Sequence, residues 1–159
     1  MKRQRTIKLG SSLENLFQVD QFVEEISDEH MLYGSYFGNI LMAVTEAVQN
    51  AMTHGNGLNE ERLVYIKEEM NEAGLWITVK DEGAGFNYSD FLIKNRKEGF
   101  NSEKTGILLI QTLCDEVRFF DEGRTIEMLF RINGIDDSIF SRRQAFMHDF
   151  FKVYQRLNT

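Results

Sequence analysis

The chain has 159 residues, enough for one ordinary domain, and its 18 Lys and Arg against 25 Asp and Glu give a formal net charge of −7. Hydrophobic residues make up 42% and charged residues 27%, which excludes a disordered, collagen-like or coiled-coil chain. The acidic balance argues against direct nucleic-acid binding, which needs a basic surface. Because Cys114 is the single cysteine and no apolar run approaches the roughly 20 residues of a membrane span, we expect a soluble cytoplasmic protein without a membrane partner.

Proline is absent, so glycines and polar clusters mark the boundaries of the predicted elements. Ser11 or Ser12 is expected to cap the first helix, and Gly55-Asn56-Gly57 stops the second. In chain order the elements are a strand at 5–9, helices at 12–28 and 36–54, strands at 62–71 and 75–81, a helix at 106–115, strands at 117–121 and 124–132, and a helix at 136–157. Since the strands arrive mainly as hairpins interleaved with helices, the sequence predicts an α/β two-layer sandwich. Its mixed, mostly antiparallel sheet carries helices on one face.

The helix at 36–54 has an unusual polar side. At about 100° per residue its apolar residues share one side, whereas Glu46, Asn50 and His54 fall on the opposite side. A solvated face is the simpler interpretation, although such faces favour Lys, Glu and Arg over a carboxylate, an amide and an imidazole at four-residue spacing. An acid and an amide oxygen one turn apart have the chemistry to hold a hydrated Mg²⁺ and to polarise a hydroxyl group.

A glycine turn, Gly83-Ala84-Gly85, follows the strand at 75–81. Asp81 shares its side of that strand with Ile77 and Val79, so its carboxylate faces the apolar side of the sheet. An inward carboxylate needs a donor, which either the turn itself or the amino group of a ligand would supply. Gly83 and Gly85 permit positive φ and close backbone approach.

Together, Glu46-x-x-x-Asn50 with His54-Gly55-Asn56 and Asp81-x-Gly83-x-Gly85 resemble the N-box and first glycine box of the GHKL ATPase superfamily. That superfamily includes gyrase, histidine kinases and the anti-sigma-factor serine kinases. The short chain and the sequence Leu113-Cys114-Asp115-Glu116-Val117 look most like the anti-sigma-factor kinases. The resemblance implies the Bergerat ATP-binding fold, with an ATPase domain at residues 1–132 and a C-terminal helical extension at residues 133–159.

The resemblance also implies roles for the motif residues. Glu46 would be the catalytic base, Asn50 the Mg²⁺ ligand, and Asp81 the acceptor for the adenine amino group of ATP. Gly83 and Gly85 would shape the adenine pocket.

The phosphate-binding part departs from the family pattern. The second glycine box reads Lys104-Thr105-Gly106, where Gly106 alone matches, at the expected N-terminus of a helix that would receive phosphate. Lys104 is either a phosphate contact or a surface charge on the nucleotide lid, which would span residues 88–105. His54 either reaches a phosphate or caps its helix. Arg124 follows Gly123 on the last strand, where the family often has Thr.

The implied function is an ATP-dependent serine/threonine protein kinase of a partner-switching pathway. Such a kinase binds a sigma factor or similar regulator, phosphorylates a small antagonist protein, and pairs as a homodimer. Glu46 favours this interpretation, since a pure binder has no chemical need for a base. The alternative is a non-catalytic, nucleotide-sensing protein-binding module on the same fold, which the altered second glycine box favours.

The helix at 136–157 is predicted to be strongly amphipathic. An arc of about 160° contains its apolar residues: Ile139, Phe140, Phe146, Met147, Phe150, Phe151, Val153, Tyr154 and Leu157. So wide an apolar face must be covered. The favoured cover is the sheet face that carries Trp76, and the alternative is a dimer or partner interface.

Overall fold

The structure is a computed structural model that describes residues 4–88, 102–132 and 137–157. Its strands and helices, in chain order, are β1 (Gln4–Gly10), α1 (Leu16–His30), α2 (Ser35–Asn50), β2 (Leu63–Asn71), β3 (Gly74–Lys80), α3 (Ser102–Leu113), β4 (Glu116–Phe120), β5 (Thr125–Phe130) and α4 (Asp137–Leu157). Short helical turns precede α1 (η1, Leu13–Asn15), extend α2 (η2, Ala51–Gly55) and separate β4 from β5 (η5, Asp121–Gly123). Every predicted element is present, with boundaries that differ by a few residues.

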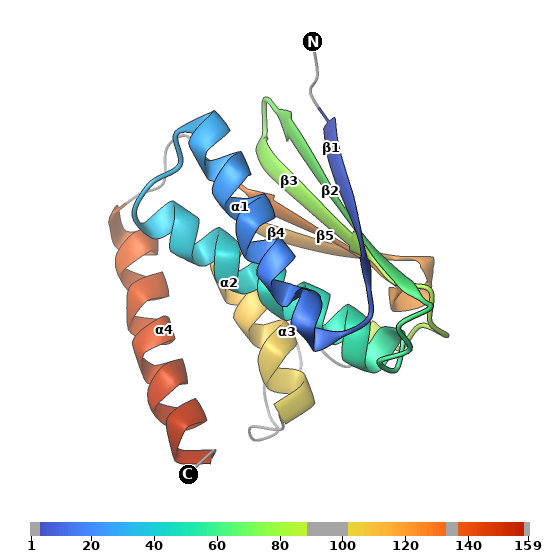
Figure 1. Ribbon diagram of the computed structural model, residues 1–159. Helices are drawn as coiled ribbons and strands as arrows, with labels where there is room; N and C mark the ends of the chain where they lie inside the picture. Colours follow the sequence, from blue (N-terminus) through green and yellow to red (C-terminus); the bar gives the residue numbers. More distant parts are fainter. Residues whose placement is uncertain (1–3, 89–101, 133–136, 158–159) are drawn as a thin grey trace.

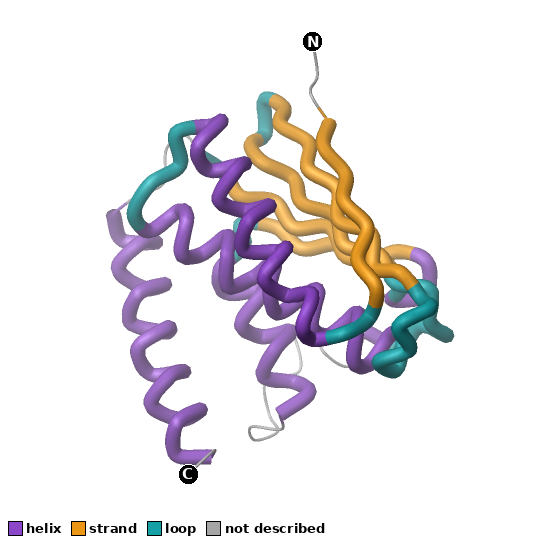
Figure 2. Tube along the Cα trace, viewed as in Figure 1, coloured by secondary structure: helices purple, strands orange, loops and turns teal. Residues whose placement is uncertain are grey.

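The sheet and the helices form separate layers, which confirms the predicted α/β sandwich (Figures 1 and 2). The strand order is β1-β2-β3-β5-β4, and all pairings of the described strands are antiparallel. A mixed, mostly antiparallel sheet was predicted, and every pairing between the described strands is in fact antiparallel. Alternation along β3 turns Leu75, Ile77 and Val79 toward the helices, where they are buried.

Helix α2 occupies the middle of the helical layer, between α1 and α3 (Figure 1). Its predicted apolar side is buried, with Ile40, Val44 and Val48 fully shielded from solvent. The predicted helical run to residue 54 is also present, but its last turn is the π-helical η2. The π-turn brings the end of the polar side of α2 close to the end of β3.

The predicted N-cap of the first helix is wrong. Ser12 makes no side-chain capping hydrogen bond, and the 3₁₀ turn η1 separates it from α1. Ser11 is fully buried, and its hydroxyl donates to the Arg62 carbonyl oxygen at 2.8 Å. A contact with a residue 51 positions away therefore replaces the local cap, and it ties the end of β1 to the start of β2.

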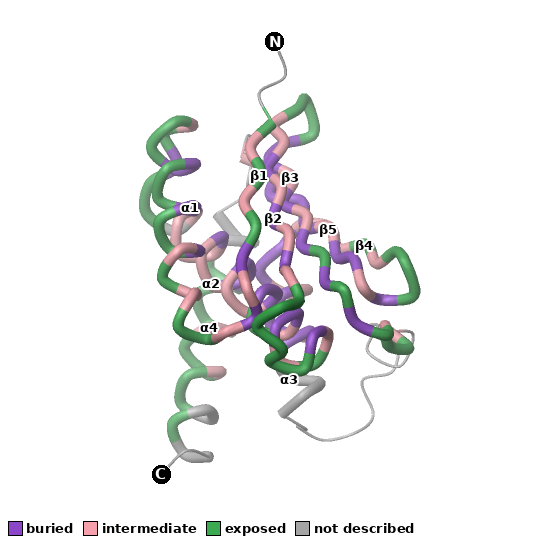
Figure 3. The backbone as a smooth tube through the Cα atoms, turned by 45° about the vertical axis from the view of Figure 1, so that its right-hand side comes forward, coloured by how far each residue is buried: buried purple, intermediate pink, exposed green. Residues whose placement is uncertain are grey.

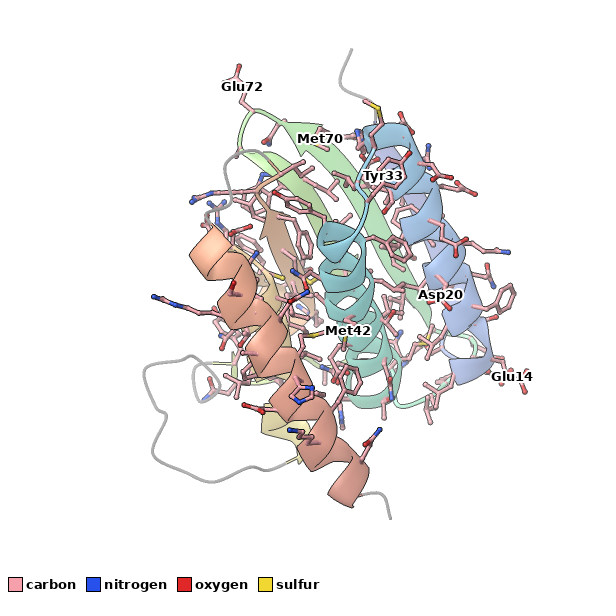
Figure 4. All side chains as sticks on the ribbon, turned by 90° about the vertical axis from the view of Figure 1, so that its left-hand side faces the viewer. Glu14, Asp20, Tyr33, Met42, Met70 and Glu72 are labelled. Carbon is pink, nitrogen blue, oxygen red and sulfur yellow. The ribbon has the colours of Figure 1, made fainter. Side chains whose placement is uncertain are left out.

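Helix α4 does not cover the sheet face of Trp76, so that prediction is also wrong. It lies on the outer side of the helical layer, away from the sheet (Figures 1 and 4). Trp76 is covered instead by the Arg118 guanidinium, 4.7 Å from its ring centroid. On α4, Arg143 donates to Asp115 at 2.8 Å, and both side chains are largely buried.

The apolar face of α4 is only partly covered. Phe146, Met147 and Phe150 are half-buried against the core, whereas Phe151 is 44% exposed. Figure 3 shows this contrast, because buried residues concentrate between the sheet and the first three helices while α4 is mainly exposed. No helix in the described part of the chain combines the length and apolar character that crossing a membrane requires.

Candidate nucleotide site

A cavity of about 160 Å³, here called the main cavity, lies between the end of α2, helix α3 and the strands β3 and β5. Its walls are mostly apolar and come from both layers: Ala47, Ala51, Val79, Phe86, Ile107, Ile110, Phe119 and Ile126. Four polar side chains also line it: Asn50, His54, Asp81 and Arg124. An apolar cleft with a few polar groups is the usual form of a small-molecule site.

Asp81 points inward at the end of β3, as the strand alternation predicted. Its side chain is nearly buried, and Oδ1 accepts a hydrogen bond from the Gly83 N–H at 2.7 Å. Burial raises the pKa of Asp81, while the Gly83 N–H and the positive charge of Arg124 oppose that increase. Among the described residues no donor bonds to Oδ2, so this oxygen is available to a ligand N–H group.

Glycines let the π-turn η2 approach the end of β3. A Cβ on Gly83 would lie 2.0 Å from the Gly55 carbonyl oxygen, and a Cβ on Gly55 would lie 2.4 Å from Asp81 Cγ. Gly83 therefore holds this wall in place without lining the cavity itself. Gly85 does line the cavity, in a left-handed conformation with φ of 83° that any other L-residue would find strained.

Glu46 and Asn50 lie together where α3 crosses α2. A Cβ on Gly106 would lie 2.0 Å from Glu46 Oε1 and 3.3 Å from Asn50 Nδ2, so Gly106 gives both side chains room. Burial raises the pKa of Glu46, and the nearby His54 imidazole partly offsets this effect. The fold thus brings Gly106 of one motif into contact with Glu46 and Asn50 of another motif, which is distant in the sequence.

The structure changes the expected position of Gly106. Helix α3 begins at Ser102, so Gly106 lies in its second turn and not at the N-terminus. The N–H groups left free by the helix belong to its first four residues, which include Lys104 and Thr105. The side chains of Lys104 and Thr105, and residues 89–101 of the predicted lid, lie outside the described part of the structure.

His54 is exposed at the main cavity.

Asn56 has a structural role that the sequence analysis did not assign. It is buried, and its Nδ2 donates to Ser11 Oγ at 2.9 Å and to the Leu63 carbonyl oxygen at 3.0 Å. Its Oδ1 accepts from the Glu82 N–H at 2.8 Å. Asn56 thereby fastens the π-turn to the ends of three strands. In the sequence, its place in the motif His54-Gly55-Asn56 was the feature that could have indicated this role.

Two aromatic rings of the cavity wall were also missed. Phe86 and Phe119 meet edge to face with centroids 5.9 Å apart, and Phe119 stacks on Tyr88 at 4.9 Å. The Phe86 N–H donates to the Glu122 carbonyl oxygen at 2.9 Å, which joins the glycine turn to the β4–β5 connection. The position of Phe86 directly after Gly85 was the signal in the sequence.

The polar groups and the apolar walls of the main cavity suit Mg-ATP. The flat aromatic faces of adenine fit between aliphatic and aromatic walls, and Asp81 offers an acceptor to its amino group. No cluster of three His, Cys, Asp or Glu side chains that could hold a metal occurs within the described ranges. A Mg²⁺ bound through Asn50 would therefore take its other ligands from phosphate oxygens and water, as this ion commonly does in ATP sites.

Comparison with known proteins agrees with this geometry. Residues 9–130 match the family model of the histidine kinase-like ATPase domain. The chain belongs to this family. The match covers strands β2 to β5, the end of β1 and all the elements that line the main cavity.

The similar proteins narrow the relationship to the anti-sigma kinase group, which confirms the resemblance seen in the motifs. The chain is 30% identical over 117 residues to an anti-sigma F factor of Bacillus cytotoxicus, covering 70% of this chain and 73% of the relative. It is 28% identical over 122 residues to an anti-sigma F factor of Clostridium perfringens, covering 73% and 79%.

A solved structure shows the same fold. The crystal structure of the RsbU and RsbW domains of Rv1364c from Mycobacterium tuberculosis superimposes with a TM-score of 0.60 at 19% identity. The match covers 81% of this chain and 32% of that longer chain.

Proposed function

We propose that this protein is an ATP-dependent serine/threonine kinase of a partner-switching pathway. It binds a sigma factor or similar regulator and phosphorylates a small antagonist protein. The names of the anti-sigma F factor relatives support the regulatory part. A paired-subunit state and a location in the cytoplasm belong to the same proposal.

The observation that carries the catalytic part is the position of Glu46. Its carboxylate lies in a half-buried position against α3, within one helical turn of Asn50, which lines the main cavity. A protein that only binds its partners would gain nothing from such a carboxylate, because burying a charged group costs free energy.

The remaining residues would bind and orient the nucleotide. Asp81 Oδ2 accepts from the adenine amino group, and Val79 and Ile126 contact the base from the sheet. Asn50 holds Mg²⁺, while His54, Lys104, Thr105 and the first turn of α3 serve the phosphates. Gly85 gives the nucleotide room, Gly83 holds the adjoining wall by its close approach to Gly55, and Gly106 makes room for Glu46 and Asn50. The assignments of Asn50, Asp81, Gly83, Gly85 and Gly106 follow the family motifs, and those of Val79 and Ile126 follow their places in the cavity lining.

The proposed chemistry is transfer of the terminal phosphoryl group to a seryl or threonyl hydroxyl. Bound Mg-ATP supplies that group and neutralises part of its charge. Glu46 accepts the hydroxyl proton while the hydroxyl oxygen forms its bond to phosphorus and the bond to the ADP oxygen breaks. Because burial raises the pKa of Glu46, its carboxylate is a stronger base than an exposed glutamate.

A non-catalytic nucleotide-sensing module remains the second candidate. Arg124 favours it, because this bulky cation lines the main cavity directly after Gly123, at a position where the family often has Thr. The two candidates differ in whether bound ATP is consumed.

Phosphoryl transfer from labelled Mg-ATP to small antagonist proteins of the same genome tests the proposal. We expect Glu46→Gln to bind ATP with unchanged affinity and to lose about 10²–10⁴-fold in transfer rate, which is the usual contribution of a general base. Glu72→Gln is the matched control, since Glu72 is exposed in the β2–β3 turn far from the main cavity (Figure 4). Wild-type protein that binds Mg-ATP yet phosphorylates none of these antagonists would establish the non-catalytic module instead.

A further inference from the structure

A second cavity, of about 300 Å³, lies at the opposite end of α2 from the main cavity. Glu24, Ser27 and Asp28 of α1 line it together with Tyr33 of the α1–α2 connection and Phe37 of α2. Figure 4 shows Tyr33 on that connection, well separated from Asp20 on α1 and from Glu14 on η1. Phe37 and Ala47, the nearest α2 residues in the two linings, are ten positions apart, so about 15 Å of helix separates the two cavities.

The second cavity has an acidic edge without counter-charges. Glu24 and Asp28 are four residues apart on α1 and are therefore neighbours on its surface. Within the described residues neither carboxylate forms an ion pair, whereas the adjacent Glu25 and Glu29 both pair with Arg5. No cationic side chain is among the lining residues, and two full negative charges outweigh the partial positive charge of the α2 N-terminus.

Ser27 supplies the independent observation. Its side chain is 3% exposed, and its hydroxyl has no hydrogen-bond partner within the described structure although it borders the second cavity. Its carbonyl oxygen already accepts from the Leu32 N–H at 2.8 Å. A buried hydroxyl without a partner costs folding free energy, and a donor group from a ligand would remove that cost.

We propose that the second cavity binds an arginine side chain of a protein partner. The Glu24 and Asp28 carboxylates and the Ser27 hydroxyl accept from its N–H groups, and Tyr33 and Phe37 provide aromatic faces. Arginine fits this set better than lysine, because its flat guanidinium carries five donors and stacks on aromatic rings. This proposal does not depend on the nucleotide site.

The surface beside the second cavity indicates a protein as the source of the arginine. Tyr33 is 66% exposed and Met31 is 74% exposed. Tyrosine, methionine and arginine are enriched in protein–protein interfaces, where apolar contacts surround a buried charge. A free guanidinium compound would leave this apolar rim uncovered.

An NMR titration of the full ¹⁵N-labelled chain tests the proposal with N-acetyl-arginine methylamide as the probe. We expect saturable shifts of the Ser27, Leu32 and Gly34 amides, and none with the uncharged citrulline analogue. Glu24→Gln/Asp28→Asn should weaken binding about tenfold. Glu14→Gln/Asp20→Asn is the matched control, because it removes the same charge from exposed positions outside the cavity (Figure 4).

Several results would overturn the proposal. The first is amide shifts from the citrulline analogue that equal those from the arginine probe. The second is an equal loss of probe affinity in the two double variants. The third is binding of the corresponding lysine compound as tightly as the arginine probe. The protein source is tested with the dipeptide N-acetyl-Phe-Arg amide, which should bind more tightly than the single residue and lose that gain in Met31→Asn. Equal affinity of dipeptide and single residue would assign the cavity to a free guanidinium compound instead.

Ser27→Ala provides a readout that a merely structural serine would not give. Removing an unpartnered buried hydroxyl should raise the melting temperature by about 2–4 °C. It should also weaken the arginine probe by about threefold, because one acceptor is lost. A lower melting temperature, or unchanged probe affinity, would show that the hydroxyl serves the fold and not a ligand.

Discussion

The main cavity and helix α4 are joined to the rest of the molecule by different kinds of contact. At the cavity, backbone approaches backbone, so that a Cβ on Gly83 would lie 2.0 Å from the Gly55 carbonyl oxygen. At α4, the contact is made by side chains, chiefly the ion pair of Arg143 with Asp115 and the half-buried rings of Phe146 and Phe150.

This difference shows what each region tolerates. The shape of the main cavity depends on residues that lack a side chain, so the addition of one methyl group should distort it. The position of α4 depends on charge and on apolar volume, so the loss of a side chain should loosen it. The two regions should therefore respond to opposite kinds of substitution.

Gly83→Ala should have the largest effect on stability. Its new Cβ would overlap the Gly55 carbonyl group, which is backbone and cannot rotate away, and we expect a loss of about 3 kcal/mol together with the loss of ATP binding. Gly38→Ala is the matched control, because Gly38 lies inside α2 with no atom within 4 Å of the new Cβ. That change should stabilise the protein by about 0.5–1 kcal/mol. Chemical denaturation checks both, and a Gly83→Ala protein as stable as wild type would refute the close backbone contact.

Arg143→Met should come next. Breaking a buried ion pair typically costs about 3–5 kcal/mol, and we expect about 2 kcal/mol here because Asp115 keeps its hydrogen bond from the Arg131 N–H. ATP affinity should not change, since α4 does not line the main cavity. Arg142→Met, at an exposed position on the same helix, should be nearly neutral. Equal melting temperatures for the two variants would show that the ion pair does not hold α4.

Glu46→Gln should have the smallest effect on stability, and the size of that effect should depend on pH. Because burial raises the pKa of Glu46, the folded protein binds this proton more tightly than the unfolded chain does. The buried charge of Glu46 lowers the free energy of unfolding at pH values above the raised pKa. This loss disappears as the pH falls to the pKa of the unfolded chain, about 4.3. Glu46→Gln should therefore melt at a higher temperature than wild type near neutral pH, and the gain should shrink on acidification. Melting curves across this range test the claim, and a pH-independent difference would contradict it.

Local patterns predicted most of the fold and, among the residues that line the main cavity, Asn50, His54, Asp81 and Gly85. The alternation of β3 turned Asp81 inward, and the apolar side of α2 was identified from its helical period. Sequence spacing cannot show which helix will cross another. Only the folded chain therefore brings Gly106 against Glu46 and Asn50.

The wrong predictions for Ser11 and for α4 share a physical cause, which is competition from contacts distant in the sequence. Ser11 was available to cap a helix, but its hydroxyl bonds to Arg62. The period of α4 identified its apolar side correctly but not the surface that this side would contact. The start of α3 was placed late because its first turn, from Ser102 to Thr105, is polar and was interpreted as part of the preceding loop.

Isothermal titration calorimetry of Asp81→Asn tests the central claim, that the main cavity binds the adenine of ATP through this carboxylate. Glu82→Gln is the control, because the neighbouring Glu82 faces away and accepts from the Leu63 N–H and the Tyr65 hydroxyl. Asp81→Asn should weaken ATP and ADP equally, by roughly tenfold to more than a hundredfold, since a hydrogen bond to a charged group is worth about 1.5–3 kcal/mol. Glu82→Gln should leave both affinities unchanged. An Asp81→Asn protein that is folded and binds both nucleotides as tightly as wild type would contradict the account.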